Sequence, residues 1–260
     1  MIVKGKLHMQ QATGPNFLTE YILRISKEKI NKALLKLILQ GILAGIYISI
    51  AAIGYFKLTA TIVDPGLAAF FGALVFPLGI IAIIIMHGEL YTSGCLAMTA
   101  IYAGKTKLYM VLRTLGIILL ANLIGCIFIS YLTTTAGIFN EQIMGVVIEK
   151  AIAKVHLPIG KLFISGILCN IIVCTGMCMA YSCREEITKI IVLWLSISVF
   201  VLTGTEHVVA NMYYLFTAYF GGAEISLLEI LYNLSVSALG NFVGGGIVVA
   251  GTNYIIGQQS

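Results

Sequence analysis

Two adjacent ionisable residues, Glu206 and His207, interrupt a long apolar stretch. Sixteen uncharged residues precede the pair and sixteen follow it, so the stretch runs from Ile190 to Ala223. Ionisable side chains at membrane depth are costly and usually mark a pathway for ions or protons. Imidazole changes its charge near neutral pH, so His207 can donate a hydrogen bond or a proton to a solute in such a pathway. We expect Glu206 to have a structural role and to accept hydrogen bonds from nearby backbone N–H groups.

A second glutamate interrupts an apolar run earlier in the chain. Glu89 lies in the segment MHGELYTSG, where Gly88 and Gly94 flank polar residues. Glycine lets the backbone leave helical geometry, and non-helical backbone at membrane depth must be buried by protein or reached by water. We therefore expect a broken helix at each glutamate, with half-helix N-termini that favour anions. Glu89 is expected to accept backbone hydrogen bonds, as Glu206 is.

The elements that must position these residues are membrane-spanning helices. Of the 260 residues, 59% are hydrophobic and 10% are charged, whereas soluble domains carry about 25% charged residues. Continuous apolar runs exclude an outer-membrane barrel, and a spanning helix needs about 20 such residues. Six runs qualify: Leu37–Phe56, Gly66–Met86, Thr114–Asn140, Leu162–Cys183, Ile190–Ala223 with its Glu-His interruption, and Ile230–Ser260.

Basic residues are divided unequally between the two sides of the predicted bundle. Six spans put both termini on one side, and that side holds 12 of the 16 lysines and arginines. The richer side is expected to be cytoplasmic. The positive net charge therefore indicates topology, and nucleic acid is not an expected partner. Basic residues alternate with Ile and Leu over Tyr21–Lys36, which predicts an amphipathic helix on the membrane surface.

Three matches recur in the same order in the two halves of the chain. GILAG at 41–45 resembles GILCN at 166–170, and ANLIGC at 121–126 resembles GNFVGG at 240–245. Glu89 and Glu206 correspond to each other, 117 positions apart. Three spans per copy is an odd number, so the second copy must cross the membrane inverted. Inverted repeats with interrupted helices point to a transport site near the midplane.

The segments GELYTSG, GILCNIIVC, EHVVANM and GNFVGGG together resemble the signatures of the formate/nitrite transporter family. The resemblance covers residues 30–257 and implies an all-α, aquaporin-like channel domain whose second and fifth helices are broken. Its two inverted repeats would span 30–140 and 155–257, after a cytoplasmic amphipathic segment at 1–29. The resemblance also implies a homopentamer in a bacterial inner membrane, surrounded by lipid, with both termini cytoplasmic. Members pass small monovalent anions such as formate, nitrite and hydrosulfide, are not enzymes, and need no cofactor.

The resemblance also assigns roles to single residues. The family's central histidine falls on His207, and its loop threonine falls on Thr92, a hydroxyl partner for His207 or for the anion. Lys154, in AKVHLPIGK, would attract anions at the outer pore mouth, and Asn170 and Asn241 would line the pore. Hydrophobic constrictions, which can gate by excluding water, are implied at Phe76, Ile80 and Phe200.

Two positions depart from the pattern of formate and nitrite members. Thr205 precedes the Glu-His pair where those members usually carry an aromatic residue, and His87 stands where a small or apolar residue is common. The chain therefore looks closer to the hydrosulfide channels of the family. We expect hydrosulfide as the main substrate, with formate and nitrite also permeant. The role of His87 stays open between tuning a gate and capping a carbonyl.

Three alternative functions remain. The first is a formate or nitrite transporter, with or without a coupled proton. The second is an aquaporin-like pore for neutral solutes, although the NPA repeats of that class do not occur. The third, a haem-bearing enzyme, is disfavoured because His87 and His207 are the only histidines at predicted membrane depth.

Overall fold

The long apolar runs form helices in the computed structural model, which describes residues 14–259. Residues 1–13, which include Lys4 and Lys6 and make up the first part of the predicted N-terminal segment, lie outside the described residues. The predicted number of spans is confirmed, because six helical segments of the described part are long and apolar enough to cross a membrane. They are Leu34–Thr59, Pro65–Ile85, Leu108–Thr135, Ile159–Ser182, Glu186–Thr203 and Leu227–Gln258.

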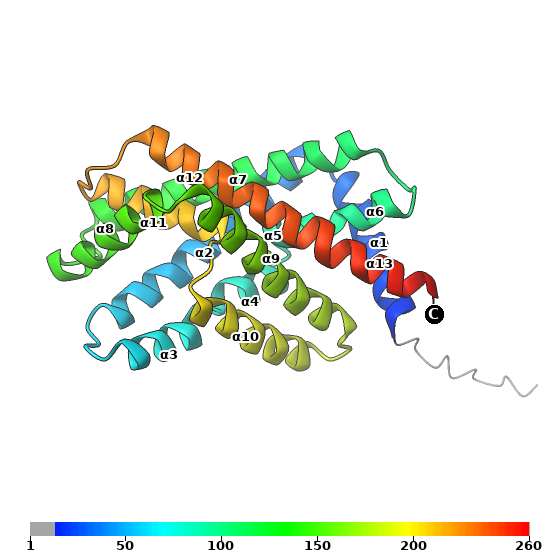
Figure 1. Cartoon of the computed structure of the whole chain (residues 1–260), viewed down its shortest axis with the longest axis horizontal. Coiled ribbons are helices and arrows are strands. Elements are labelled where there is room, and N and C mark those ends of the chain that lie inside the picture. The colour runs from blue at the N-terminus through cyan, green and yellow to red at the C-terminus, as the bar shows by residue number, and fades with distance from the viewer. Residues whose placement is uncertain (1–13, 260) are drawn as a thin grey trace, which may run out of the picture.

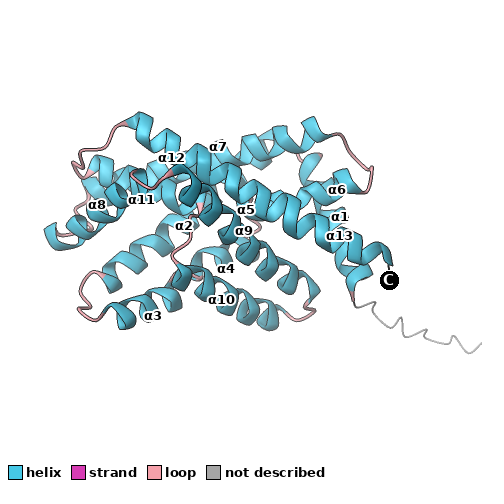
Figure 2. Ribbon diagram, in the orientation of Figure 1, coloured by secondary structure: helices cyan, strands magenta, loops and turns pink. Residues whose placement is uncertain are grey.

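Each half of the bundle has a full helix, a broken helix and a second full helix, in that order (Figure 1). The first half consists of α2 (Leu34–Thr59), α3 (Pro65–Val75), α4 (Leu78–Ile85), α5 (Tyr91–Gly94), η1 (Cys95–Met98), α6 (Thr99–Tyr102) and α7 (Leu108–Thr135). The second half consists of α9 (Ile159–Ser182), α10 (Glu186–Thr203), α11 (Val208–Phe220), α12 (Leu227–Phe242), η2 (Val243–Val249) and α13 (Ala250–Gln259). Two further helices, α1 (Pro15–Ile30) and α8 (Glu141–Val155), accompany the two halves (Figure 2).

The two breaks occur at equivalent places in the two halves. The chain after α10 turns at Gly204, whose φ is 61°, and the chain after α4 turns at His87, whose φ is 54°. These two residues are 117 positions apart, as Glu89 and Glu206 are. A left-handed residue just past a helix is a common C-terminal signal, usually supplied by glycine. The predicted interruption of the second and fifth membrane helices is thereby confirmed.

Glycines bring the full helices of each half into close contact. A Cβ atom at Gly125 of α7 would collide with the carbonyl oxygen of Ile42 in α2. At the matching crossing, a Cβ atom at Gly244 of η2 would collide with the carbonyl oxygen of Ile167 in α9. Small residues allow such close approach of helices in membranes. Gly125 and Gly244 are 119 positions apart, and Ile42 and Ile167 are 125 positions apart. The repeat seen in the sequence is therefore also a repeat of helix packing.

The two ends of the bundle carry different elements. α1 and α13 lie together at one end, and α8 lies at the other end (Figure 1). The predicted surface helix over Tyr21–Lys36 needs correction, because α1 ends at Ile30 and a new helix begins at Leu34. Residues Thr19, Ile22 and Ser26 of α1 are buried against the protein. The helix therefore packs on the bundle itself, with α13, α6, η1 and α9 as neighbours.

Candidate functional site

His207 and Thr92 join the two broken helices inside the bundle. His207 is the N-cap of α11, and its Nδ1 accepts a hydrogen bond from the backbone N–H of Ala210 at 3.1 Å. Its Nε2 lies 3.0 Å from the hydroxyl oxygen of Thr92, at the start of α5. A neutral imidazole has one acceptor and one donor nitrogen, so this network assigns the proton to Nε2. The hydrogen bond expected between Thr92 and His207 is present.

His207 borders a small cavity whose other lining side chains are apolar. The cavity lies between the two halves, because helices of both repeats contribute to it. Phe76, Ile80 and Phe200, which the family resemblance placed at constrictions, all line it. Sequence reasoning missed the remaining lining residues, which are Ile48, Leu90, Val173 and Ile197.

Phe76 and Phe200 separate this central cavity from a vestibule at the α8 end. Both side chains line both spaces. Their ring centroids are 6.1 Å apart, and the Phe200 ring lies 5.5 Å from the His207 ring. The two rings are thus placed where a constriction was expected. Ile80 lines the central cavity on the other side of Phe76 and does not line the α8 vestibule.

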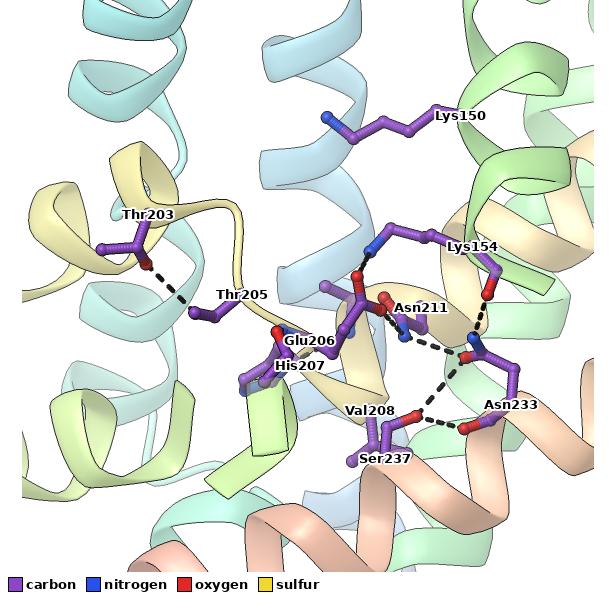
Figure 3. Close-up of polar contacts among 12 residues, drawn as sticks. Lys150, Lys154, Thr203, Thr205, Glu206, His207, Val208, Asn211, Asn233 and Ser237 are labelled. Atoms are coloured by element: carbon purple, nitrogen blue, oxygen red, sulfur yellow. Dashed lines mark hydrogen bonds and ion pairs between the residues drawn. The ribbon is translucent and has the colours of Figure 1, made fainter. Parts of the chain in front are cut away.

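Glu206 is held by side chains, which corrects the expectation of backbone donors. Its Oε1 pairs with the Lys154 amino group at 2.7 Å, and its Oε2 accepts from the Asn211 amide at 2.7 Å (Figure 3). Asn233 in turn accepts from Asn211 and donates to the Lys154 carbonyl oxygen. The side-chain oxygen of Asn211 has no hydrogen-bond partner among the described residues.

Lys154 lines the α8 vestibule, as expected for a residue near a pore mouth, but it is a largely buried partner of Glu206. Its exposed fraction is 7%. Burial lowers the pKa of the Lys154 amino group, and the neighbouring carboxylate opposes this shift. The opposite charges lie so close together that their fields largely cancel at a distance. Lys154 fixes the second break in place and offers little free charge to an approaching anion.

Glu89 also uses side-chain partners, again contrary to the expectation of backbone donors. The Lys29 and Lys32 amino groups lie 2.6 and 2.5 Å from its two carboxylate oxygens. Lys32 also donates to the Gln40 side chain at 2.8 Å. From the sequence, both lysines were expected on the polar face of an amphipathic surface helix, on the cytoplasmic side of the membrane. In the structure they connect α1 and the following turn to the first break.

His87 lines a second vestibule, at the α1 end, together with Lys29, Lys32 and Glu89. Its side chain is exposed, and its own carbonyl oxygen accepts a hydrogen bond from the Gln40 amide at 2.7 Å. The Gln40 side chain therefore caps the backbone carbonyl group of His87. His87 also adopts the left-handed conformation that Gly204 adopts at the equivalent position.

Two equivalent asparagines hold the loops of the two breaks. Asn122 accepts from the Tyr91 backbone N–H and donates to the carbonyl oxygens of Gly41 and Glu89. Asn241 makes the same contacts in the second repeat. It accepts from the Val208 backbone N–H and donates to the carbonyl oxygens of Gly166 and Glu206. Buried backbone groups that leave a helix need such partners.

The predicted pore-lining role of Asn170 and Asn241 needs correction, because their side-chain amides bond to buried backbone groups. Asn170 donates to the carbonyl oxygens of Thr92 and Asn241. Both side chains are fully buried, and neither lines the central cavity or the two vestibules. Their amides are already engaged by the backbone. They position the two breaks around the cavity.

Comparisons with known proteins agree with this geometry. The model of the family described as formate/nitrite transporter matches residues 17–255. The formate channel FocA of Haemophilus influenzae is 32% identical over 262 residues, covering 92% of each protein. A solved FNT family ion channel superposes with a TM-score of 0.82 at 27% identity, covering 93% of this chain and 97% of its own. A solved pentameric formate channel with formate bound superposes with a TM-score of 0.79 at 31% identity, covering 86% and 98%.

Proposed function

Because the chain belongs to the formate/nitrite transporter family, we propose that it conducts small monovalent anions through a pore in each protomer. The route runs from the α8 vestibule past Phe76 and Phe200 into the central cavity, and from there past Ile80 and Leu90 to the α1 vestibule. The family consists of transport proteins, and the chain is not an enzyme. The observation that supports this route most strongly is the imidazole of His207 in an otherwise apolar cavity between two vestibules.

The physical difficulty in this route is the loss of anion hydration in the apolar cavity. His207 reduces the cost by turning its Nε2–H hydrogen bond to the anion, or by taking up a proton from vestibule water and passing it as imidazolium to the anion, which returns the ring to its neutral form. The resting network favours an Nε2–H donor, because protonation of Nδ1 would break its hydrogen bond from Ala210. The Thr92 hydroxyl accepts that Nε2–H hydrogen bond and so holds the ring in place beside the cavity.

Hydrosulfide is the substrate that fits this cavity best. As a base, hydrosulfide is close in strength to imidazole, so it accepts a proton more readily than formate or nitrite, which are much weaker bases. The neutral acid then crosses the apolar walls without the cost of a bare charge. A single polar lining group also suits a one-centre anion better than a carboxylate with two oxygens. Thr205, where formate and nitrite members usually carry an aromatic residue, lines the α8 vestibule and supports the same choice.

Formate is the second candidate substrate. The relative from Haemophilus influenzae is named a formate channel, and one structural neighbour contains bound formate. Formate and nitrite are therefore expected to permeate as well, with or without a coupled proton. A neutral-solute pore is the remaining alternative.

The protein is further proposed to be a homopentamer in a bacterial inner membrane, in contact with lipid. The α1 and α13 end is assigned to the cytoplasm, because it carries most of the basic residues. Residues 1–29 form the cytoplasmic segment, and residues 30–257 form the channel, with repeats at 30–140 and 155–257. The solved pentameric relative supports the stoichiometry.

Electrical recording in planar bilayers tests the proposed function. The purified protein is exposed in turn to hydrosulfide, formate, nitrite and chloride at equal concentration. We expect anion currents with hydrosulfide permeating best and with measurable formate and nitrite currents. Absence of anion current combined with rapid water or urea flux would support a neutral-solute pore and reject the proposal. A formate permeability above that of hydrosulfide would reject the substrate order alone.

A further inference from the structure

Lys150 lies one helical turn before Lys154 on the same face of α8. Residues four positions apart are neighbours on a helix surface, and both lysines line the α8 vestibule. Figure 3 shows the two side chains leaving α8 one above the other, with Lys154 directed to Glu206 and Lys150 directed elsewhere. The Lys150 amino group donates to the Tyr55 hydroxyl of α2 at 2.9 Å.

The two lysines differ in the charge of their partners. Lys154 is paired with a carboxylate. Among the described residues, the hydrogen-bond and ring partners of the Lys150 amino group are neutral, with the Tyr55 ring centre 4.9 Å away and that of Tyr214 6.0 Å away. No carboxylate among residues 14–259 forms an ion pair with Lys150. Aromatic faces hold a cation in place without cancelling its charge.

The hydrogen-bond directions leave two donor groups available at this position, the Lys150 ammonium and the Tyr55 hydroxyl. A lysine ammonium has three N–H donors, and Tyr55 takes one of those on Lys150. Because the Tyr55 oxygen accepts that hydrogen bond, the Tyr55 O–H proton is free to point to another acceptor. One small anion can therefore contact an uncompensated ammonium and a phenol at the same time.

This two-donor position adjoins the constriction. The Tyr55 ring meets the Phe76 ring edge-on at 6.2 Å between centroids, and Phe76 in turn faces Phe200. An anion at Lys150 and Tyr55 would thus stand directly before the step at which it loses its hydration. We propose that Lys150 and Tyr55 form the anion-recruiting subsite of the α8 vestibule, the task that sequence reasoning assigned to Lys154. This inference rests on the proposed function.

Liposome uptake of formate tests the subsite, since formate remains an anion across the neutral pH range. The change is Lys150→Met, and the matched control is Lys161→Met, an exposed lysine in the first turn of α9. At low ionic strength and subsaturating formate, we expect Lys150→Met to slow uptake on the order of threefold, the effect of one unit charge at short range in water. The loss should shrink at high salt because exposed charges are screened. Lys161→Met should match the wild type.

Two further variants separate charge from packing. Lys150→Arg keeps the charge and should retain uptake. Tyr55→Phe keeps the ring, removes the phenol donor, and should lower uptake by an amount that persists at high salt. Equal losses in Lys150→Met and Lys161→Met, or unchanged uptake in Lys150→Met at low salt, would overturn the subsite while leaving the channel intact. A wild-type protein that passes no anion in planar bilayers would overturn the proposed function and the subsite together.

Discussion

The two ring nitrogens of His207 have separate tasks. Nδ1 caps α11, and Nε2 faces the Thr92 hydroxyl of the other repeat. The neighbouring Glu206 turns away to Lys154, so the adjacent residues of the sequence serve different sites in the structure. The carboxylate positions the loop, and the imidazole is left as the polar group of the cavity.

The buried pair of Lys154 and Glu206 gives a stability prediction. Glu206→Gln leaves the lysine charge buried without a counter-ion, and removing one partner of such a pair costs about 3–5 kcal/mol. We expect a clear fall in the thermal unfolding temperature of the detergent-solubilised protein. The double variant Lys154→Met with Glu206→Gln should be more stable than Glu206→Gln alone, because no unpaired charge remains.

The exposed residue Lys161 serves as the control for this pair. Lys161→Met should leave the unfolding temperature unchanged, since surface charges contribute little. Two results would show that the two side chains do not depend on each other. One is a Glu206→Gln variant as stable as the wild type. The other is a double variant whose loss of stability equals the sum of the losses in Glu206→Gln and Lys154→Met.

The two broken helices are held by one device used twice. Asn122 and Asn241 each bond to one backbone N–H and one carbonyl group of a break, and to one carbonyl group of the full helix before it. The glycines that bring α2 to α7 and α9 to η2 are repeated in the same way. The inverted repeat thus preserves the contacts of the loops as well as the order of the helices.

The equivalence of the two asparagines predicts equal effects of substitution. Asn122→Leu and Asn241→Leu each remove the partner of one buried N–H and one buried carbonyl of the break, at roughly 1–3 kcal/mol for each group that finds no other partner. We expect similar, large losses of unfolding temperature in both variants. Asn253→Leu is the comparison, because the partly buried Asn253 amide bonds to the Val249 carbonyl oxygen one turn earlier and to the Cys178 sulfur, and it does not contact either break. Losses no larger than that of Asn253→Leu would contradict the role assigned to both asparagines.

Helix positions and the repeat were predictable because apolar run length and glutamate spacing are local features of the sequence. The partners of the two glutamates were not predictable in this way. Lys29 and Lys154 meet glutamates 60 and 52 positions away in the sequence, and nothing in their own segments marks them as buried. Asn170 and Asn241 were expected to line the pore, and their side chains instead bond to the backbone of the breaks. Whether their amides face the pore or the backbone depends on packing between helices.

The outer surface of the whole bundle is strongly apolar. Large side chains of several helices are exposed, such as Leu39 and Ile50 on α2 and Leu120 and Phe128 on α7. Lipid and neighbouring protomers are the partners that suit such a surface in a membrane protein. We expect native mass spectrometry in mild detergent to give a pentamer. A stable monomer or trimer as the largest species would contradict the proposed assembly.

The role of His207 is tested most directly by His207→Asn. Asparagine is a preferred N-cap, so it can replace Nδ1 at Ala210 and still donate a hydrogen bond, but it cannot transfer a proton. Hydrosulfide uptake into liposomes with an internal pH dye, and bilayer current on the same variant, measure the two activities separately. Proton-coupled uptake is expected to be lost while some anion current remains. Wild-type proton-coupled uptake in His207→Asn would contradict proton donation by His207, and loss of both signals together would show that the imidazole keeps the pore open.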